Sequence, residues 1–110
     1  MSLFIRKVKQ MIRGTTPTHT FKIPFDASVV KSAMVIYAQD GMEVLHKETE
    51  DCELEGKTIK TKLSQEDTFK FSHTANVQIQ LRLLTMSGDA LVSDIKTVSV
   101  EQCLNNEVLA

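Results

Sequence analysis

The stretch that decides the fold is residues 76–85, NVQIQLRLLT. Apolar side chains stand at every second position from 77 to 83, and Gln or Arg stands between them. A period of two places successive side chains on opposite faces of a strand, so this stretch predicts a β-strand with one buried and one wet face. The next four residues, Met86-Ser87-Gly88-Asp89, predict a hairpin turn centred on Gly88.

Upstream of this strand, two neighbouring runs predict a second hairpin. Residues 29–39 are nearly continuously apolar, which predicts a strand that is central in its sheet or covered on both faces and that buries Tyr37. Asp40-Gly41 follows directly, and Asp-Gly between two strand-like runs is the strongest short signal for a tight hairpin. Residues 42–48 are therefore expected to return antiparallel to residues 29–39.

Further strands are expected on the same period. They cover residues 18–23, 52–54, 58–63, 69–71 and 90–101. Pro17 and Pro24 flank the first of these, and because proline removes a ladder donor they favour an edge or terminal position for it. His19 falls on the apolar face of that strand.

Two local signals interrupt the series of strands. Ser64 with an acidic residue, Asp67, three positions later is a capping-box pattern and predicts a single helical turn. Between Ile95 and Val98 the apolar residues change phase, which predicts a bulge or a change of sheet.

Strands at this spacing, with hairpins and no long helix, predict an all-β fold, an Ig-like antiparallel β-sandwich of about seven to eight strands. The Cys–Trp–Cys set and the tyrosine corner of antibody domains are absent, so the likeness is one of architecture; a closed small barrel is the alternative fold. The 110 residues suffice for one domain. We expect an N-terminal arm at 1–13, the sandwich at 14–104 and a tail at 105–110.

The N-terminal arm is basic and has helical spacing. Residues 1–3 are typical of an expression leader, with Met11 an alternative start. Residues 4–12 predict a short amphipathic helix, because their apolar positions recur at three and four; these are Phe4, Ile5, Val8, Met11 and Ile12. The candidate partner surface is accordingly Phe4, Ile5, Val8 and Met11, with packing onto the chain's own sandwich as the alternative. The arm is expected either to dock on a neighbouring copy or to remain a solvated tail.

Composition excludes several classes of function. The net charge of −1, the single Tyr and the absence of Trp argue against a nucleic-acid-binding protein. No apolar run approaches the roughly 20 residues that span a bilayer, and no signal peptide is recognisable, so we expect a cytoplasmic protein without membrane contact. Cys52 and Cys103 are expected as thiols, with a disulfide as the less favoured alternative.

No catalytic or cofactor motif is present. The sequence has no phosphate-binding glycine loop, no HExxH and no GxSxG. His19, His46 and His73 lack metal-ligand spacing, and the carboxylates around Cys52 oppose a reactive thiolate. The acidic run from Glu48 to Glu55 is expected to be a charged edge strand, with a calcium site as the alternative. We therefore expect no enzyme activity, no catalytic residues, no metal and no cofactor.

Three segments carry a family resemblance. They contain RGTTPTHTF with PFD (residues 13–26), QEDTF (65–69) and GDALVSDI (88–95), in an order that extends over about residues 11–103. The chain resembles a family of small prophage-encoded β-sandwich proteins found beside phage structural genes. More distantly, it is similar to the Ig-like N-terminal module of phage baseplate upper proteins, which serves as an attachment module.

The resemblance implies a non-enzymatic phage structural or assembly protein, associated with the tail or baseplate and acting through protein–protein contacts. Its expected partners are other phage structural proteins, and a homo-oligomer formed through the N-terminal arm or the edge strands is a further expectation. Such a protein is made in the cytoplasm of the bacterial host and then incorporated in the virion. The alternative function is a ligand- or carbohydrate-binding β-sandwich module.

Overall fold

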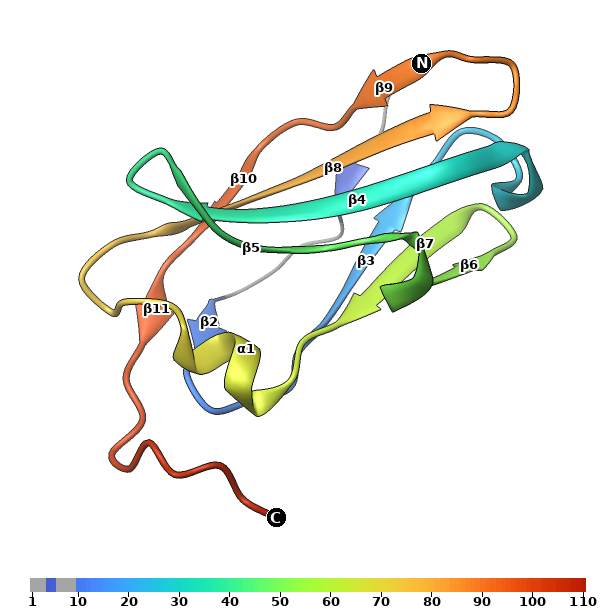
Figure 1. Ribbon diagram of the computed structural model, residues 1–110. Helices are drawn as coiled ribbons and strands as arrows, with labels where there is room; N and C mark the ends of the chain where they lie inside the picture. Colours follow the sequence, from blue (N-terminus) through green and yellow to red (C-terminus); the bar gives the residue numbers. More distant parts are fainter. Residues whose placement is uncertain (1–3, 6–9) are drawn as a thin grey trace.

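The computed structural model describes residues 4–5 and 10–110 (Figure 1). Its elements are, in chain order, β1 (Phe4–Ile5), β2 (Met11–Ile12), β3 (Thr18–Lys22), the 3-10 helix η1 (Ala27–Val29), β4 (Val30–Gln39), β5 (Met42–Lys47), the 3-10 helix η2 (Thr49–Asp51), β6 (Cys52–Glu55), β7 (Thr58–Lys62), α1 (Gln65–Phe69), β8 (Val77–Thr85), β9 (Ala90–Val92), β10 (Lys96–Val98) and β11 (Val100–Glu101).

The strands form two antiparallel sheets that pack against each other. The first sheet has the order β1-β3-β7-β6, and the second has the order β10-β8-β4-β5 with β9 also beside β8 (Figure 1). A short parallel pair joins β2 to β11. These orders match the A-B-E-D and G-F-C-C′ sheets of Ig-like domains, so the predicted all-β, Ig-like antiparallel sandwich is confirmed.

Both predicted hairpins are present. At the β4–β5 turn Asp40 has φ 51° and Gly41 has φ 76°, the pair of positive angles that a tight two-residue hairpin needs. The second hairpin joins β8 to β9 around Gly88, with Leu84 opposite Ala90. As expected, β4 is central, since it lies between β8 and β5.

The core lies between the sheets and consists of the inward side chains of both. The largest fully buried side chains are Tyr37, Phe21, Phe71, Met11, Ile59, Leu63, Ile79 and Leu81. Every predicted inward position of β8 is buried, and His19 is buried on the same face of β3 as Phe21, as its phase indicated.

One polar contact crosses this apolar core. His19 of β3, only 2% exposed, places its Nδ1 atom 2.6 Å from the hydroxyl oxygen of Tyr37 on β4 in the other sheet. The His19 Nε2 atom is buried and has no hydrogen-bond partner among the described residues. Burial lowers the pKa of His19 to about 4 and raises that of Tyr37, so both side chains are neutral in the folded protein at pH 7.

The N-terminal helix prediction is wrong. Phe4–Ile5 forms strand β1 and Met11–Ile12 forms strand β2, while residues 6–9 lie outside the described part. A helix of this length has marginal stability in water, whereas β1 extends the four-stranded sheet beside β3 and β2 forms a two-stranded parallel pair with β11. Met11 is fully buried in the core, so the sandwich includes residues that the expected arm at 1–13 contained.

The strand expected at 69–71 is also absent. Helix α1 extends to Phe69, and Phe71 is buried from a bend rather than from a strand. The predicted capping box does form: the amide of Asp67 donates to Ser64 Oγ at 3.0 Å, and the amide of Ser64 donates to Asp67 Oδ2 at 2.9 Å. Lys47 Nζ of β5 lies 2.7 Å from Asp67 Oδ2, which ties the helix to the second sheet.

The edge position expected for residues 18–23 is wrong, because β3 lies between β1 and β7. In the described part of the chain, β1 pairs with Phe21 and Lys22, at the end of β3 that precedes Pro24. By contrast, β6 with its acidic residues does lie at a sheet edge, as expected.

The predicted irregularity near Ile95 is confirmed. Three residues, Ser93 to Ile95, separate β9 from β10. The Ser93 hydroxyl accepts from the amide of Leu81 at 2.9 Å, and its own amide donates to the Leu81 carbonyl at 2.9 Å. A side chain thus replaces one backbone acceptor, which interrupts the ladder and changes the phase. Cys52 and Cys103 are both free thiols.

The turn around Gly14 yields a first prediction. Gly14 has φ +83°, and a Cβ there would lie 2.8 Å from Phe69 Cζ. We expect Gly14→Ala to lower the free energy of unfolding by about 1–3 kcal/mol, because it adds backbone strain and a clash with α1. Gly88→Ala is the matched control, since Gly88 also has a positive φ but no atom within 4 Å of its added Cβ. Urea denaturation that gives equal losses for both variants would contradict the packing argument.

His19 yields a second prediction. Its pKa is about 4 in the folded chain, against about 6.5 in an unfolded chain. Between these values the unfolded state binds more protons, so the stability that the neutral ring supplies is full above pH 6.5 and is lost as the pH falls to 4. The expected loss is about 3 kcal/mol.

The measurement is urea denaturation at several pH values between 4 and 7. His19→Asn removes the titrating ring, so its unfolding free energy should change less with pH than that of the parent chain. An unchanged pH slope in His19→Asn would show that other groups cause the acid sensitivity.

Candidate interaction surface

The two sheets differ in what they present to solvent. The outward residues of β3 and β7 in the four-stranded sheet are Thr and Lys, with Glu53 of β6 opposite Lys60. The outward residues of β4 include Met34, Ile36 and Ala38, all half-buried. One sheet therefore has an ordinary wet face, and the other has a largely apolar stripe.

We call this second surface the outer face. It comprises outward side chains of β4, β5, β8 and β9 together with Glu48, which follows β5; these are Ser32, Met34, Ile36, Ala38, Gln78, Gln80, Arg82, Leu84, Ala90, Val92, Glu43, His46 and Glu48. Strand register arranges them in rows. Arg82 lies opposite Met34 on one side and Val92 on the other, and Ile36 lies between Gln80 and His46.

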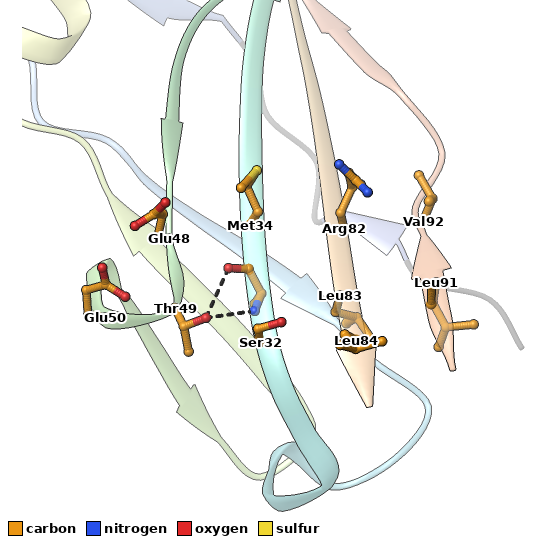
Figure 2. A pocket seen from close by; sticks show the side chains of 12 residues that line it. Ser32, Met34, Glu48, Thr49, Glu50, Arg82, Leu83, Leu84, Leu91 and Val92 are labelled. Carbon is orange, nitrogen blue, oxygen red and sulfur yellow. Dashed lines mark hydrogen bonds between the residues drawn. The ribbon is translucent and has the colours of Figure 1, made fainter. Parts of the chain in front are cut away.

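A hollow of about 470 Å³ occupies one end of the outer face. Figure 2 shows Met34, Arg82 and Val92 in one row on adjacent strands, with Glu48 on the other side of Met34. The other residues that line the hollow are Ser32, Ala33, Thr49, Glu50, Leu83, Leu84, Ala90 and Leu91. The lining is therefore mainly aliphatic, with one cation and two carboxylates.

Arg82 is the cation of the hollow, and its side chain is exposed. Its guanidinium has no hydrogen bond or ion pair to any residue in the described part of the chain. Five N–H donors in a planar fork thus remain available for a carboxylate.

The opposite margin of the outer face, along β5, is acidic. His46 Nδ1 lies 2.8 Å from Glu43 Oε2, and His46 Nε2 lies 3.6 Å from Glu48 Oε1. The hydrogen bond to Glu43 is the main cause that raises the pKa of His46, and Glu48 adds to it. The apolar stripe of β4 therefore runs between an unpaired arginine on β8 and a carboxylate-rich margin on β5.

Thr49 fixes the position of Glu48. After β5 ends, the Thr49 hydroxyl accepts from the amide of Ala33 at 2.9 Å and donates to the carbonyl of Ala33 at 3.2 Å (Figure 2). The carboxylate of Asp51 accepts from the amide of Glu48 at 3.0 Å. Beyond the end of β5, the Thr49 side chain thus takes the place of a backbone partner for Ala33 of β4. As a result, Glu48 stays opposite Met34 of β4.

Of the residues that the sequence singled out for chemistry, His46 and Glu48 lie close together, but they form no metal centre within the described part of the chain. Among the described residues no three His, Cys, Asp or Glu side chains gather in a way that could hold a metal ion. The run from Glu48 to Glu55 is divided between the outer face and edge strand β6. Burial, the main cause, raises the pKa of the Cys52 thiol, which favours the protonated, unreactive form.

The candidate partner surface predicted in the arm is not assembled as a helical stripe. Met11 is buried in the chain's own core. Phe4 and Ile5 are described only as backbone of β1, and Val8 lies outside the described residues. The outer face was missed, although the sequence carried its signal: residues 33–38 are apolar in both phases of the strand, so one set had to point away from the core.

Compared with models of protein families and with curated proteins, the chain matches none of them. Within residues 4–5 and 10–110, no helix has the length and apolar character needed to cross a bilayer.

The acidic margin yields a third prediction. Because the Glu43 carboxylate stabilises the protonated imidazole, NMR titration should give His46 a pKa above its ordinary value of 6.5. Glu43→Gln should lower that pKa toward 6.5 and leave His19 near 4, since His19 is buried in the core away from this margin. A His46 that titrates at or below 6.5 in the parent chain would contradict the arrangement of the margin.

Proposed function

We propose that this protein is a non-enzymatic assembly module that acts through protein–protein contacts made by its outer face. The observation that carries the proposal is the contrast between the two sheets: the apolar row Met34, Ile36 and Ala38 lies on one, whereas the outward residues of β3 and β7 on the other are lysines and threonines. An apolar patch bordered by charged groups is typical of a surface that a partner covers.

The class of particle follows from the sequence resemblance. The motifs RGTTPTHTF, QEDTF and GDALVSDI resemble those of prophage-encoded β-sandwich proteins, so we propose a phage tail or baseplate as the assembly. In that setting the chain is made in the bacterial cytoplasm and then enters the virion, where other phage structural proteins are its partners. A rigid sandwich with an apolar face suits such a role, because it binds without turnover.

The alternative function is the binding of a ligand or carbohydrate, and the hollow is a specific observation that favours it. Its volume of about 470 Å³ lies in the range of small-molecule sites. However, none of its lining residues is aromatic, so a sugar ring would find no stacking surface there. The lining fits contact with apolar and charged protein side chains better.

The test is particle association, which forms a fourth prediction. After prophage induction, mass spectrometry of density-purified particles should detect this chain well above a cytosolic marker protein. Ile36→Lys should reduce its amount in particles by about tenfold, equivalent to about 1.4 kcal/mol, because a buried contact would have to accept a charge.

Thr20→Lys is the matched control, because Thr20 is half-buried on the outward side of the other sheet. It should enter particles at the level of the parent chain. Background levels of the parent chain in purified particles, or equal losses for both variants, would overturn the proposal.

A further inference from the structure

The charges of the outer face are arranged as a self-complementary pattern. In the row through Met34, Arg82 lies on one side and Glu48 on the other, one strand away in each direction. The register sets this spacing, since Val35 pairs with Lys47 and the next outward position of the β5 side is Glu48. Neighbouring strands are about 4.8 Å apart, so the backbone positions of Arg82 and Glu48 lie at similar distances from β4 on its two sides.

We propose that the outer face pairs with the same face of a second copy of this chain, about a two-fold axis that runs nearly along β4, so that Arg82 of each copy meets Glu48 of the other. The inference deepens the proposed function, because it rests on the outer face making protein contacts and names the partner.

The position of the axis follows from the charges. A two-fold axis along β4 exchanges the β8 side with the β5 side, so it brings each guanidinium over a carboxylate. An axis along the row, perpendicular to β4, would instead place Arg82 on Arg82 and Glu48 on Glu48, and like charges repel. Only the first arrangement uses the unpaired donors of Arg82.

The remaining rows agree with the same axis. Met34, Ile36 and Ala38 lie on β4 and would each meet the equivalent residue of the second copy, which buries the apolar stripe. Gln78 lies opposite Ala38 on the β8 side, and Glu43 lies opposite Ala38 on the β5 side, so the Gln78 amide would meet the Glu43 carboxylate. Packed sheets are about 10 Å apart, a gap that facing Arg and Glu side chains span together.

The size of the face predicts a weak contact. Four strands and the outward positions from Ser32 to Ala38 cover roughly 15 Å by 20 Å between backbone atoms. The area of a face with these dimensions is smaller than the roughly 800 Å² per partner that a stable standard interface buries. We therefore expect dissociation constants in the micromolar range or weaker. A multicopy particle raises the local concentration and would make such a contact effective.

The test is a charge exchange in the full chain, measured by sedimentation equilibrium from about 10 µM to 1 mM, and it forms the fifth prediction. The parent chain should show a monomer–dimer equilibrium that weakens with added salt. Arg82→Glu and Glu48→Arg should each weaken self-association by about tenfold or more, because each homodimer then carries two like-charged pairs.

Recovery is the decisive result. An equimolar mixture of the two variants should form heterodimers, because positions 82 and 48 then carry opposite charges in both of the contacts between the copies. The double variant R82E/E48R should form homodimers again, since the two charges have only changed places. Arg82 has no partner in the described part of its own chain, so its reversal should leave the far-UV circular dichroism spectrum and the urea midpoint unchanged.

Lys62→Glu is the matched control, since it reverses an exposed cation on the outward side of the other sheet, opposite Thr18. It should dimerise like the parent chain. A parent chain that is monomeric at 1 mM, a mixture that does not recover dimers, or assembly beyond two copies would each overturn the inference, because an isologous contact closes at a dimer.

The two proposals fail separately. If the outer face binds a different protein, the parent chain stays monomeric at 1 mM while Ile36→Lys is still lost from particles. That outcome would reject self-pairing and retain the assembly function.

Discussion

The structure depends on the pairing of β4 with β8. These long strands run antiparallel from Val30 opposite Thr85 to Ala38 opposite Gln78, and both are interior in their sheet. Because side chains alternate, this single register decides two surfaces at once. Val35, Tyr37, Ile79 and Leu81 go to the core, and Met34, Ile36 and Arg82 go to the outer face. A slip of one residue would exchange the two sets, so core packing also fixes the positions of the charges outside.

The core itself contains a buried pair of polar side chains, Tyr37 and His19. Tyr37 is the largest buried side chain, and its hydroxyl requires a partner inside the sandwich. His19 supplies one from the opposite sheet, although its own Nε2 atom is buried and has no partner among the described residues. The pair specifies how the sheets face each other, because an apolar side chain in place of either residue would leave the other unsatisfied.

Much of the fold could be predicted from periodicity, because alternation and turn residues are local signals. Residues 76–85, the Asp40-Gly41 hairpin and the capping box at Ser64 form as expected. The failures are those where a nonlocal contact decides. The spacing of Phe4, Val8 and Met11 fits a helix, but Met11 is taken into the core by pairing with β11. Phe69 and Phe71 fit a strand, but the helix begun at the capping box continues through Phe69.

The outer face could be predicted only in part. Apolar residues in both phases of 33–38 show that some must point outward, yet which charges flank them depends on the register of β4 with β5 and β8.

The edges of the sandwich explain why association should use a face. Strand β6 ends its sheet with exposed Glu53 and Glu55. On the other sheet, the pairing of edge strand β5 with β4 has a register irregularity near Tyr37. Strands β9 and β10 both pair with β8, and Ser93, which lies between them in the chain, interrupts that pairing. Charge, bulge and interruption each oppose the addition of another strand, which would otherwise continue without limit. A face-to-face contact, in contrast, closes after two copies. At β5, at β6 and along β9 and β10 these features oppose the open-ended route, and the outer face with its complementary charges remains available, which is the arrangement that the proposed self-pairing requires.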